Sequence, residues 1–146
     1  VPSLATDALV LRTRPGGSEL LLIRRGEDPD RGCLALPGGF VEYGEDPEDC
    51  VLRELSEETG LNGRNPHLIR VAGDPMRDMR KHVVSVIYHV EVPTDAIAVA
   101  GDDAAEIVWI DIGVLPAVDD EIWAFDHGRI VHDAMKHPWV IELRGA

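Results

Sequence analysis

The chain has 146 residues and a formal net charge of −13, with 27 acidic and 14 basic side chains. A hydrophobic fraction of 45% is enough for a packed core, so we expect one folded domain over residues 1–146 rather than a disordered chain. The strong acidity argues against a nucleic-acid-binding protein, because phosphate backbones are bound by Lys and Arg. Apolar stretches such as residues 20–23 are far too short to cross a bilayer, so no membrane contact is expected.

Two cysteines, Cys33 and Cys50, stand far apart in the sequence and belong to no CxxC pair. This spacing argues against a disulfide scaffold and against a cysteine-based zinc site. We therefore expect a reduced, cytoplasmic protein in which both cysteines serve as small apolar side chains.

The first part of the chain is predicted to form a β-hairpin followed by a helix. Residues 6–13 and 18–24 are rich in Val and Leu and flank a turn at Pro15-Gly16, and residues 33–36 form a shorter strand. A helix begins after an acidic N-cap at Glu45 or Asp46, with Pro47 in its first turn, and ends at Thr59 before Gly60.

The second part alternates between strands and a final helix. Strands are predicted at residues 67–72, 81–92 and 106–111, and a C-terminal helix at residues 120–135. Strands interspersed with two helices predict an α/β or α+β fold, with a sheet covered by helices.

Charge is concentrated in the predicted first helix, where residues 42–58 contain eight acidic side chains and one Arg. At about 100° per residue, Glu54, Glu57 and Glu58 share one helical face beside the apolar face. Like charges three and four positions apart destabilise a helix, so helix stability does not explain them. Hard divalent cations are bound by such carboxylates and by backbone carbonyl oxygens, which the Gly38-Gly39 segment could supply.

This segment resembles the Nudix box. The similarity comprises Gly39, five residues, Glu45, seven residues and the run Arg53-Glu54-Leu55-Ser56-Glu57-Glu58-Thr59-Gly60-Leu61, which fills nine restricted positions over 23 residues. The resemblance implies the Nudix fold, a mixed β-sheet sandwiched between helices. It also implies Mg²⁺-dependent attack of water on a nucleoside diphosphate linked to another group, with Mn²⁺ as a possible substitute.

The resemblance also implies roles for individual residues. Glu54, Glu57 and Glu58 would bind the metal together with the carbonyl of Gly38, and Glu54 and Glu57 would also act in catalysis. Arg53 would orient a glutamate of the box. A further carboxylate, from Asp102, Asp103 or Glu106, would act as an additional ligand or as the base; we take Glu106 as the candidate.

Two more segments resemble the ADP-ribose pyrophosphatase branch of the family, namely residues 36–45 and residues 74–86, although Met79 stands where that branch has Pro. We expect Arg77 and Arg80 to bind the diphosphate, because Arg favours bidentate phosphate contacts. The alternative is that both arginines pair with Asp74 and Asp78 inside their own loop. Phe40 and Tyr43 are candidates for stacking on adenine.

The expected activity is hydrolysis of ADP-ribose to AMP and ribose 5-phosphate. A first alternative is a Nudix hydrolase of nucleoside triphosphates, nucleotide-sugars or dinucleoside polyphosphates. A second, from another class, is a non-catalytic ADP-ribose-sensing domain, although such sensors tend to lose box carboxylates that this chain retains. The expected partner is a small nucleotide, and the resemblance suggests a homodimer.

Overall fold

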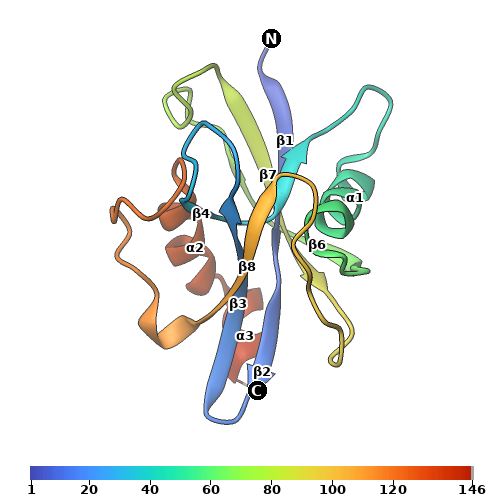
Figure 1. The fold of residues 1–146 in the computed structure, drawn as a ribbon, viewed down its shortest axis with the longest axis vertical. Coiled ribbons are helices and arrows are strands. Elements are labelled where there is room, and N and C mark those ends of the chain that lie inside the picture. The colour runs from blue at the N-terminus through green and yellow to red at the C-terminus, as the bar shows by residue number, and fades with distance from the viewer. Residues whose placement is uncertain (146) are drawn as a thin grey trace.

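Two β-sheets and three α-helices form the computed structural model, which describes residues 1–145 (Figure 1). One sheet has the strand order β5-β1-β7-β6, in which only β1 and β7 run parallel. In the other sheet β3 pairs with β2, β4 and β8. The strands are β1 Ser3–Leu9, β2 Leu11–Arg14, β3 Gly17–Arg25, β4 Leu34–Ala35, β5 Gly38–Phe40, β6 Arg64–Ala72, β7 Val83–Glu91 and β8 Ala104–Asp111.

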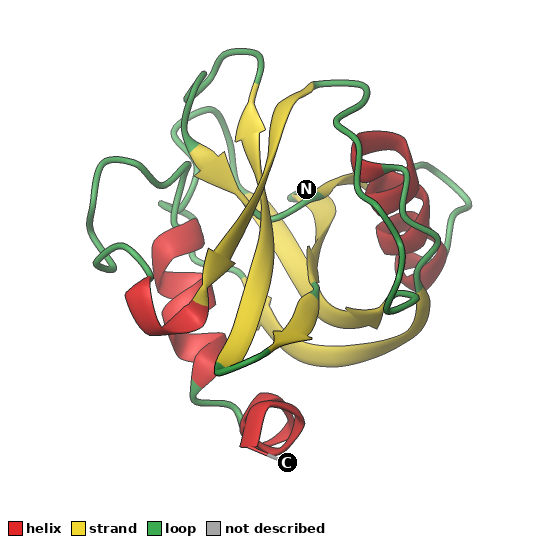
Figure 2. Ribbon diagram, turned by 60° about the horizontal axis from the view of Figure 1, so that its bottom comes forward, coloured by secondary structure: helices red, strands yellow, loops and turns green. Residues whose placement is uncertain are grey.

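Helices cover the strands from two sides, with α1 (Pro47–Thr59) on one side and α2 (His127–Met135) and α3 (Pro138–Gly145) on the other (Figure 2). Strand β3 explains this layering, because successive strand residues point to opposite faces. Leu20 and Leu22 are buried in the cluster that includes Ile130 of α2, whereas Leu21 is buried in the cluster that includes Leu55 of α1. The predicted mixed sheet between helices is therefore confirmed.

The prediction of one continuous strand over residues 6–13 is wrong. The chain leaves one sheet after Leu9 and enters the other at Leu11, with Val10 fully buried at the crossing. Apolar residues continue through this crossing because both sides of the chain are covered. Hydrophobicity alone therefore gives no sign that the strand changes sheets.

Helix α1 begins and ends where its capping residues predict. The side chain of Asp46 accepts a hydrogen bond from the Glu48 N–H at 2.8 Å, and Pro47 occupies the first turn. Gly60 adopts a left-handed conformation with φ of 71° and donates its N–H to the Ser56 carbonyl. These capping residues set the bounds of α1.

The prediction of one helix over residues 120–135 is also wrong. Residues 120–125 form turns, α2 begins only at His127, and a further helix, α3, follows it. Phe125 has a positive φ of 51°, which is rare for a bulky side chain and stops the helix from extending towards the N-terminus. Trp139 of α3 stacks on His67 of β6 with ring centroids 3.6 Å apart.

The remaining elements lie close to their predicted positions, and the strand β5 is an addition to them. Both cysteines are free, as predicted. Within residues 1–145, no helix combines the length and apolar character needed to span a membrane.

Candidate active site

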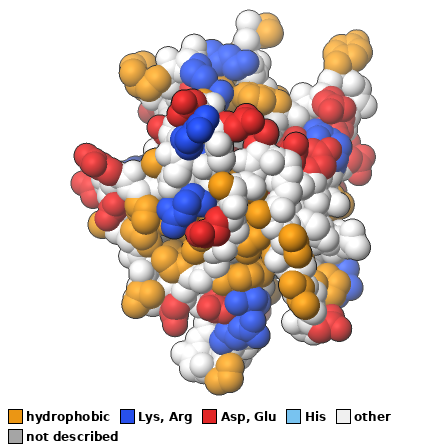
Figure 3. Space-filling view, viewed as in Figure 1, with side chains coloured by type: hydrophobic (Ala, Val, Ile, Leu, Met, Phe, Trp, Pro, Cys, Tyr) orange, Lys and Arg blue, Asp and Glu red, His pale blue; other side chains and the backbone are white. Residues whose placement is uncertain are grey.

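A cavity of about 490 Å³ lies between α1 and the segments that precede β7 and α2. One side, here called the acidic wall, consists of Gly38, Gly39, Glu54 and Glu58. The opposite side, here called the basic wall, consists of Arg25, Arg77, Arg80 and Phe125. Figure 3 shows acidic and basic side chains gathered in the upper half of that view.

Two carboxylates of α1 face the cavity from a largely buried position. Glu58 is 6% exposed, and its burial raises its pKa to about 8. The negative charges of Glu54, Asp7 and Asp102 act in the same direction, whereas a hydrogen bond from the Gly38 N–H at 2.7 Å opposes them. Burial also raises the pKa of Glu54. Both carboxylates would therefore gain stability from a cation in the cavity.

The Gly38-Gly39 pair has close contacts on both of its sides. A Cβ atom at Gly38 would lie 2.1 Å from the backbone carbonyl oxygen of Thr6 in β1. A Cβ atom at Gly39 would lie 2.5 Å from the carboxylate carbon of Glu54. Any other residue at either position would push apart β1, β5 or the acidic side chain that faces the cavity.

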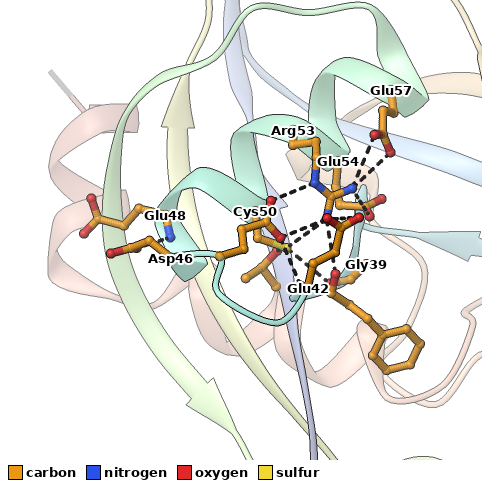
Figure 4. Close-up of polar contacts among 11 residues, drawn as sticks. Gly39, Glu42, Asp46, Glu48, Cys50, Arg53, Glu54 and Glu57 are labelled. Atoms are coloured by element: carbon orange, nitrogen blue, oxygen red, sulfur yellow. Dashed lines mark hydrogen bonds and ion pairs between the residues drawn. The ribbon is translucent and has the colours of Figure 1, made fainter.

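Arg53 holds several acidic side chains together beside the cavity (Figure 4). Its guanidinium forms two hydrogen bonds to Glu45, at 2.8 and 3.0 Å, and one to Glu54 at 2.9 Å. A longer contact of 3.2 Å reaches Glu57. These contacts raise the pKa of Arg53 and lower that of Glu45 to about 2, so Arg53 and Glu45 remain charged at neutral pH.

The third predicted metal ligand, Glu57, contacts the same guanidinium as Glu54 but faces away from the cavity. Glu57 does not line the cavity, its side chain is 43% exposed, and it points towards Arg53. In the described part of the chain, no three His, Cys, Asp or Glu side chains lie in an arrangement that holds a metal ion as they stand. The hard oxygen donors nevertheless have the chemistry that Mg²⁺ prefers.

On the basic wall, Arg77 and Arg80 are each paired with an acidic residue. Arg77 is 5% exposed and forms two hydrogen bonds to Asp126, at 2.9 and 3.0 Å. Arg80 pairs with Asp78 at 2.8 Å, which lowers the pKa of Asp78. The alternative of pairing inside the loop therefore holds for Arg80, whereas Arg77 is paired with a residue near α2 instead of with Asp74.

Arg25 is a cation of this wall that the sequence did not single out. Its guanidinium donates to the Pro29 carbonyl at 2.8 Å and lies 4.9 Å from the ring centroid of Phe125. Within residues 1–145 it has no carboxylate partner inside 4.0 Å, unlike its neighbour Arg24, which pairs with Glu106. Its position at the end of β3 gave no signal, because cations at strand ends are common on protein surfaces.

The bottom of the cavity is formed by three buried polar side chains that sequence reasoning also missed. Asp7 of β1, Ser85 of β7 and His127 of α2 are 7%, 1% and 5% exposed. Burial raises the pKa of Asp7 and lowers that of His127. We refer to these three residues as the polar floor.

The other predicted residues fall into two groups. Phe40 lines the cavity, as do Asp102 and Asp103. Tyr43 is fully exposed outside the lining, and Glu106, also outside it, pairs with Arg24 at 3.2 Å. The structure thus brings Gly38, Glu54, Glu58, Arg53, Phe40, Arg77 and Arg80 to the cavity, and it leaves Glu57, Glu106 and Tyr43 outside its lining.

Comparison with known proteins shows the family to which this chain belongs. The family model described as the NUDIX domain matches residues 3–133, which is most of the chain. The chain belongs to the Nudix family. Nudix hydrolases generally use divalent metal ions, in agreement with the hard oxygen donors of the acidic wall.

Among curated Nudix relatives, an ADP-ribose pyrophosphatase from Methanocaldococcus jannaschii is 41% identical over 135 residues, covering 92% of this chain and 74% of the relative. The ADPR responsive transcriptional repressor NtrR from Acinetobacter baylyi is 30% identical over 91% of this chain, which spans 53% of the repressor. Among solved structures, the NUDIX domain of Shewanella oneidensis NrtR complexed with ADP ribose has a TM-score of 0.80 and 26% identity. That alignment covers 93% of this chain and 88% of the other.

Proposed function

We propose that this Nudix protein hydrolyses the diphosphate bond of ADP-ribose to AMP and ribose 5-phosphate, using Mg²⁺ or, as a substitute, Mn²⁺. The observation that carries the choice of substrate is the 41% identity to an ADP-ribose pyrophosphatase over 92% of the chain, which spans both walls of the cavity. A cavity with carboxylates on one side and arginines on the other suits a diphosphate bound through a divalent cation.

Glu54 and Glu58 would hold the metal ion, together with the Gly38 carbonyl and with Glu57 once it leaves Arg53. When bound, a divalent cation neutralises the charge of the diphosphate and lowers the pKa of water. Arg53 keeps the Glu54 carboxylate in place through their 2.9 Å hydrogen bond, and Glu45 in turn fixes Arg53 with two hydrogen bonds. Arg53 is thus a positioning residue in this proposal.

A carboxylate from the loop before β8 would accept the proton of the attacking water. Glu106 was the sequence-based candidate for this role, but it lies outside the cavity lining and pairs with Arg24. Asp102 lines the cavity and stands close enough to raise the pKa of both Glu54 and Glu58. We therefore assign the proton acceptor to Asp102 in place of Glu106.

The diphosphate would be bound from the basic wall. Arg25 is the principal cation in this proposal, because Arg77 and Arg80 are already paired with carboxylates. Arg80, whose side chain is 43% exposed, can turn from Asp78 to a phosphate, whereas the buried Arg77 contributes from its fixed position. Phe40 offers a ring for the adenine, whereas the position of Tyr43 gives no support to that role.

The proposal is tested by product analysis on ADP-ribose, a nucleotide-sugar, a nucleoside triphosphate and a dinucleoside polyphosphate. With Mg²⁺, ³¹P NMR should detect AMP and ribose 5-phosphate from ADP-ribose, and chelation should stop the reaction. Asp102→Asn should lower kcat by about 10²- to 10⁴-fold, and Glu106→Gln, the matched variant outside the cavity, should retain activity. Cleavage of the triphosphate alone would contradict the substrate assignment.

Sensing of ADP-ribose without hydrolysis is the second candidate, because the similar NtrR is described as an ADPR responsive repressor. The retained carboxylates Glu54, Glu57 and Glu58 favour catalysis. Binding of ADP-ribose with no product in the experiment above would instead support sensing. A homodimer and a location in the cytoplasm stay predictions from the sequence.

A further inference from the structure

The polar floor has no role in the proposed catalytic steps, yet it lies directly beside them. Ser85 and Asp7 come from the parallel strands β7 and β1, and the Ser85 hydroxyl donates to Oδ2 of Asp7. Gly38 contacts both the acidic wall and the polar floor. Its N–H donates to Glu58, and its Cα lies next to Oδ1 of Asp7. The polar floor and the acidic wall therefore meet at a single residue.

The hydrogen-bond partners of His127 determine where its proton lies. Its Nδ1 accepts the Leu36 N–H at 3.0 Å and so carries no hydrogen. Burial favours the neutral ring, which must then carry its hydrogen on Nε2. Nε2 lies 3.9 Å from Oδ2 of Asp7, beyond hydrogen-bonding distance, so this donor is left for another group.

Asp7 also has capacity for a further partner. Within residues 1–145 the side-chain bond found for Asp7 is the one to Oδ2, so Oδ1 can still accept a hydrogen bond. No fully enclosed side-chain N or O atom in the described residues lacks a partner. Oδ1 and Nε2 are therefore not fully enclosed, and Asp7 and His127 both line the cavity. The polar floor thus offers an acceptor and a donor close together.

This arrangement identifies the chemical group that it would bind. In ADP-ribose a single methylene joins each phosphate to a ribose, so a ribose lies next to the reacting diphosphate on either side. Vicinal hydroxyls can donate to a carboxylate and accept from an imidazole N–H. We propose that Asp7, Ser85 and His127 bind the vicinal hydroxyls of one of the two riboses that flank the hydrolysed diphosphate. This inference rests on the proposed function and adds a specificity determinant to it.

The test compares kcat/KM for ADP-ribose and for two analogues, one lacking both hydroxyls of the adenosine ribose and one lacking both vicinal hydroxyls of the terminal ribose. The wild-type protein should lose about 10- to 100-fold on one analogue, which identifies the bound ribose. Asp7→Asn should lose a similar factor on ADP-ribose and discriminate far less between ADP-ribose and that analogue.

Two further variants separate binding from folding. Ser85→Ala makes a smaller change in the same cluster and should show the same reduced discrimination, even if Asp7→Asn folds poorly. Asp133→Asn removes a carboxylate that pairs with Arg70 at 2.6 Å outside the cavity, and it should leave discrimination unchanged.

The possible failures are distinguishable. Hydrolysis of all three substrates at similar rates by the wild-type protein would overturn the ribose-binding role and leave the proposed function intact. Equal losses on all three substrates in Asp7→Asn and Ser85→Ala would assign the cluster a purely structural role. No hydrolysis of ADP-ribose by the wild-type protein would overturn both proposals.

Discussion

The two walls of the cavity differ in how their charges are balanced. On the acidic wall, burial raises the pKa values of Glu54 and Glu58, so a bound cation would favour their ionised forms. On the basic wall, Arg77 and Arg80 already face Asp126 and Asp78. In the proposed function, the acidic wall would therefore supply the electrostatic attraction for a metal ion, whereas the largely preassembled basic wall would orient the bound diphosphate.

The largest effect is expected on the acidic wall, from Glu58→Gln. Glutamine keeps the size of the side chain and can still accept the Gly38 N–H, but it removes a metal-binding charge. We expect kcat to fall by about 10²- to 10⁴-fold with folding intact. Steady-state kinetics and circular dichroism measure the two properties. Near wild-type turnover would show that Glu58 is no metal ligand.

On the basic wall, stability should separate the two paired arginines. Arg77→Ala removes a guanidinium whose side chain is 5% exposed, together with two hydrogen bonds to Asp126, so the free energy of unfolding should fall by about 3–5 kcal/mol. Arg80→Ala removes a guanidinium whose side chain is 43% exposed, and the buried Asp78 keeps the hydrogen bond from the backbone N–H of residue 80, so the loss should be smaller, about 1–3 kcal/mol. Urea unfolding of both variants checks the contrast, and equal losses would contradict the difference in burial.

Arg25 differs from Arg77 and Arg80, because it lines the cavity without a carboxylate partner within 4.0 Å among residues 1–145. Arg25→Ala should raise KM for ADP-ribose and have a smaller effect on kcat. The fall in kcat/KM should correspond to a loss of about 1.5–3 kcal/mol in transition-state stabilisation. The adjacent Arg24→Ala is the matched control, because Arg24 pairs with Glu106 outside the cavity. Similar kinetics in both variants would remove Arg25 from the substrate site.

A smaller effect should appear in the pH dependence of the metal-free protein. Glu58 has a folded-state pKa of about 8 against an ordinary value of 4.5, so the folded state binds more protons between these values. Its stabilising contribution is complete below about pH 4.5 and is lost as the pH rises through about 8. Melting temperatures should therefore fall over this window, and they should fall less steeply in Glu58→Gln.

Contacts between residues that are close in sequence could be predicted, whereas contacts between distant residues could not. The acidic wall lies within residues 38–58, where capping residues and a helical period of 3.6 place Glu54 and Glu58 on one face. Only the turn of Glu57 towards Arg53 was missed there, because an i,i+4 ion pair with Arg53 draws the Glu57 side chain away from the cavity.

The basic wall and the polar floor could not be predicted in the same way. Arg77 pairs with Asp126, and Asp7 meets Ser85 and His127, across long separations in sequence. These contacts depend on the pairing of β1 with β7 and on the start of α2 at His127, which residues 120–126 delay. A single sequence carries no local signal for either feature.

If the acidic wall is a cation site, a bound divalent metal ion would replace a proton on Glu58. Calorimetric titration of the substrate-free protein with Mg²⁺, at pH values from about 5.5 to 8, tests it most directly. Affinity should increase almost tenfold per pH unit below about pH 8, with proton release, and Glu58→Gln should bind weakly without this slope. Binding that is independent of pH, or equal in the variant, would contradict the claim.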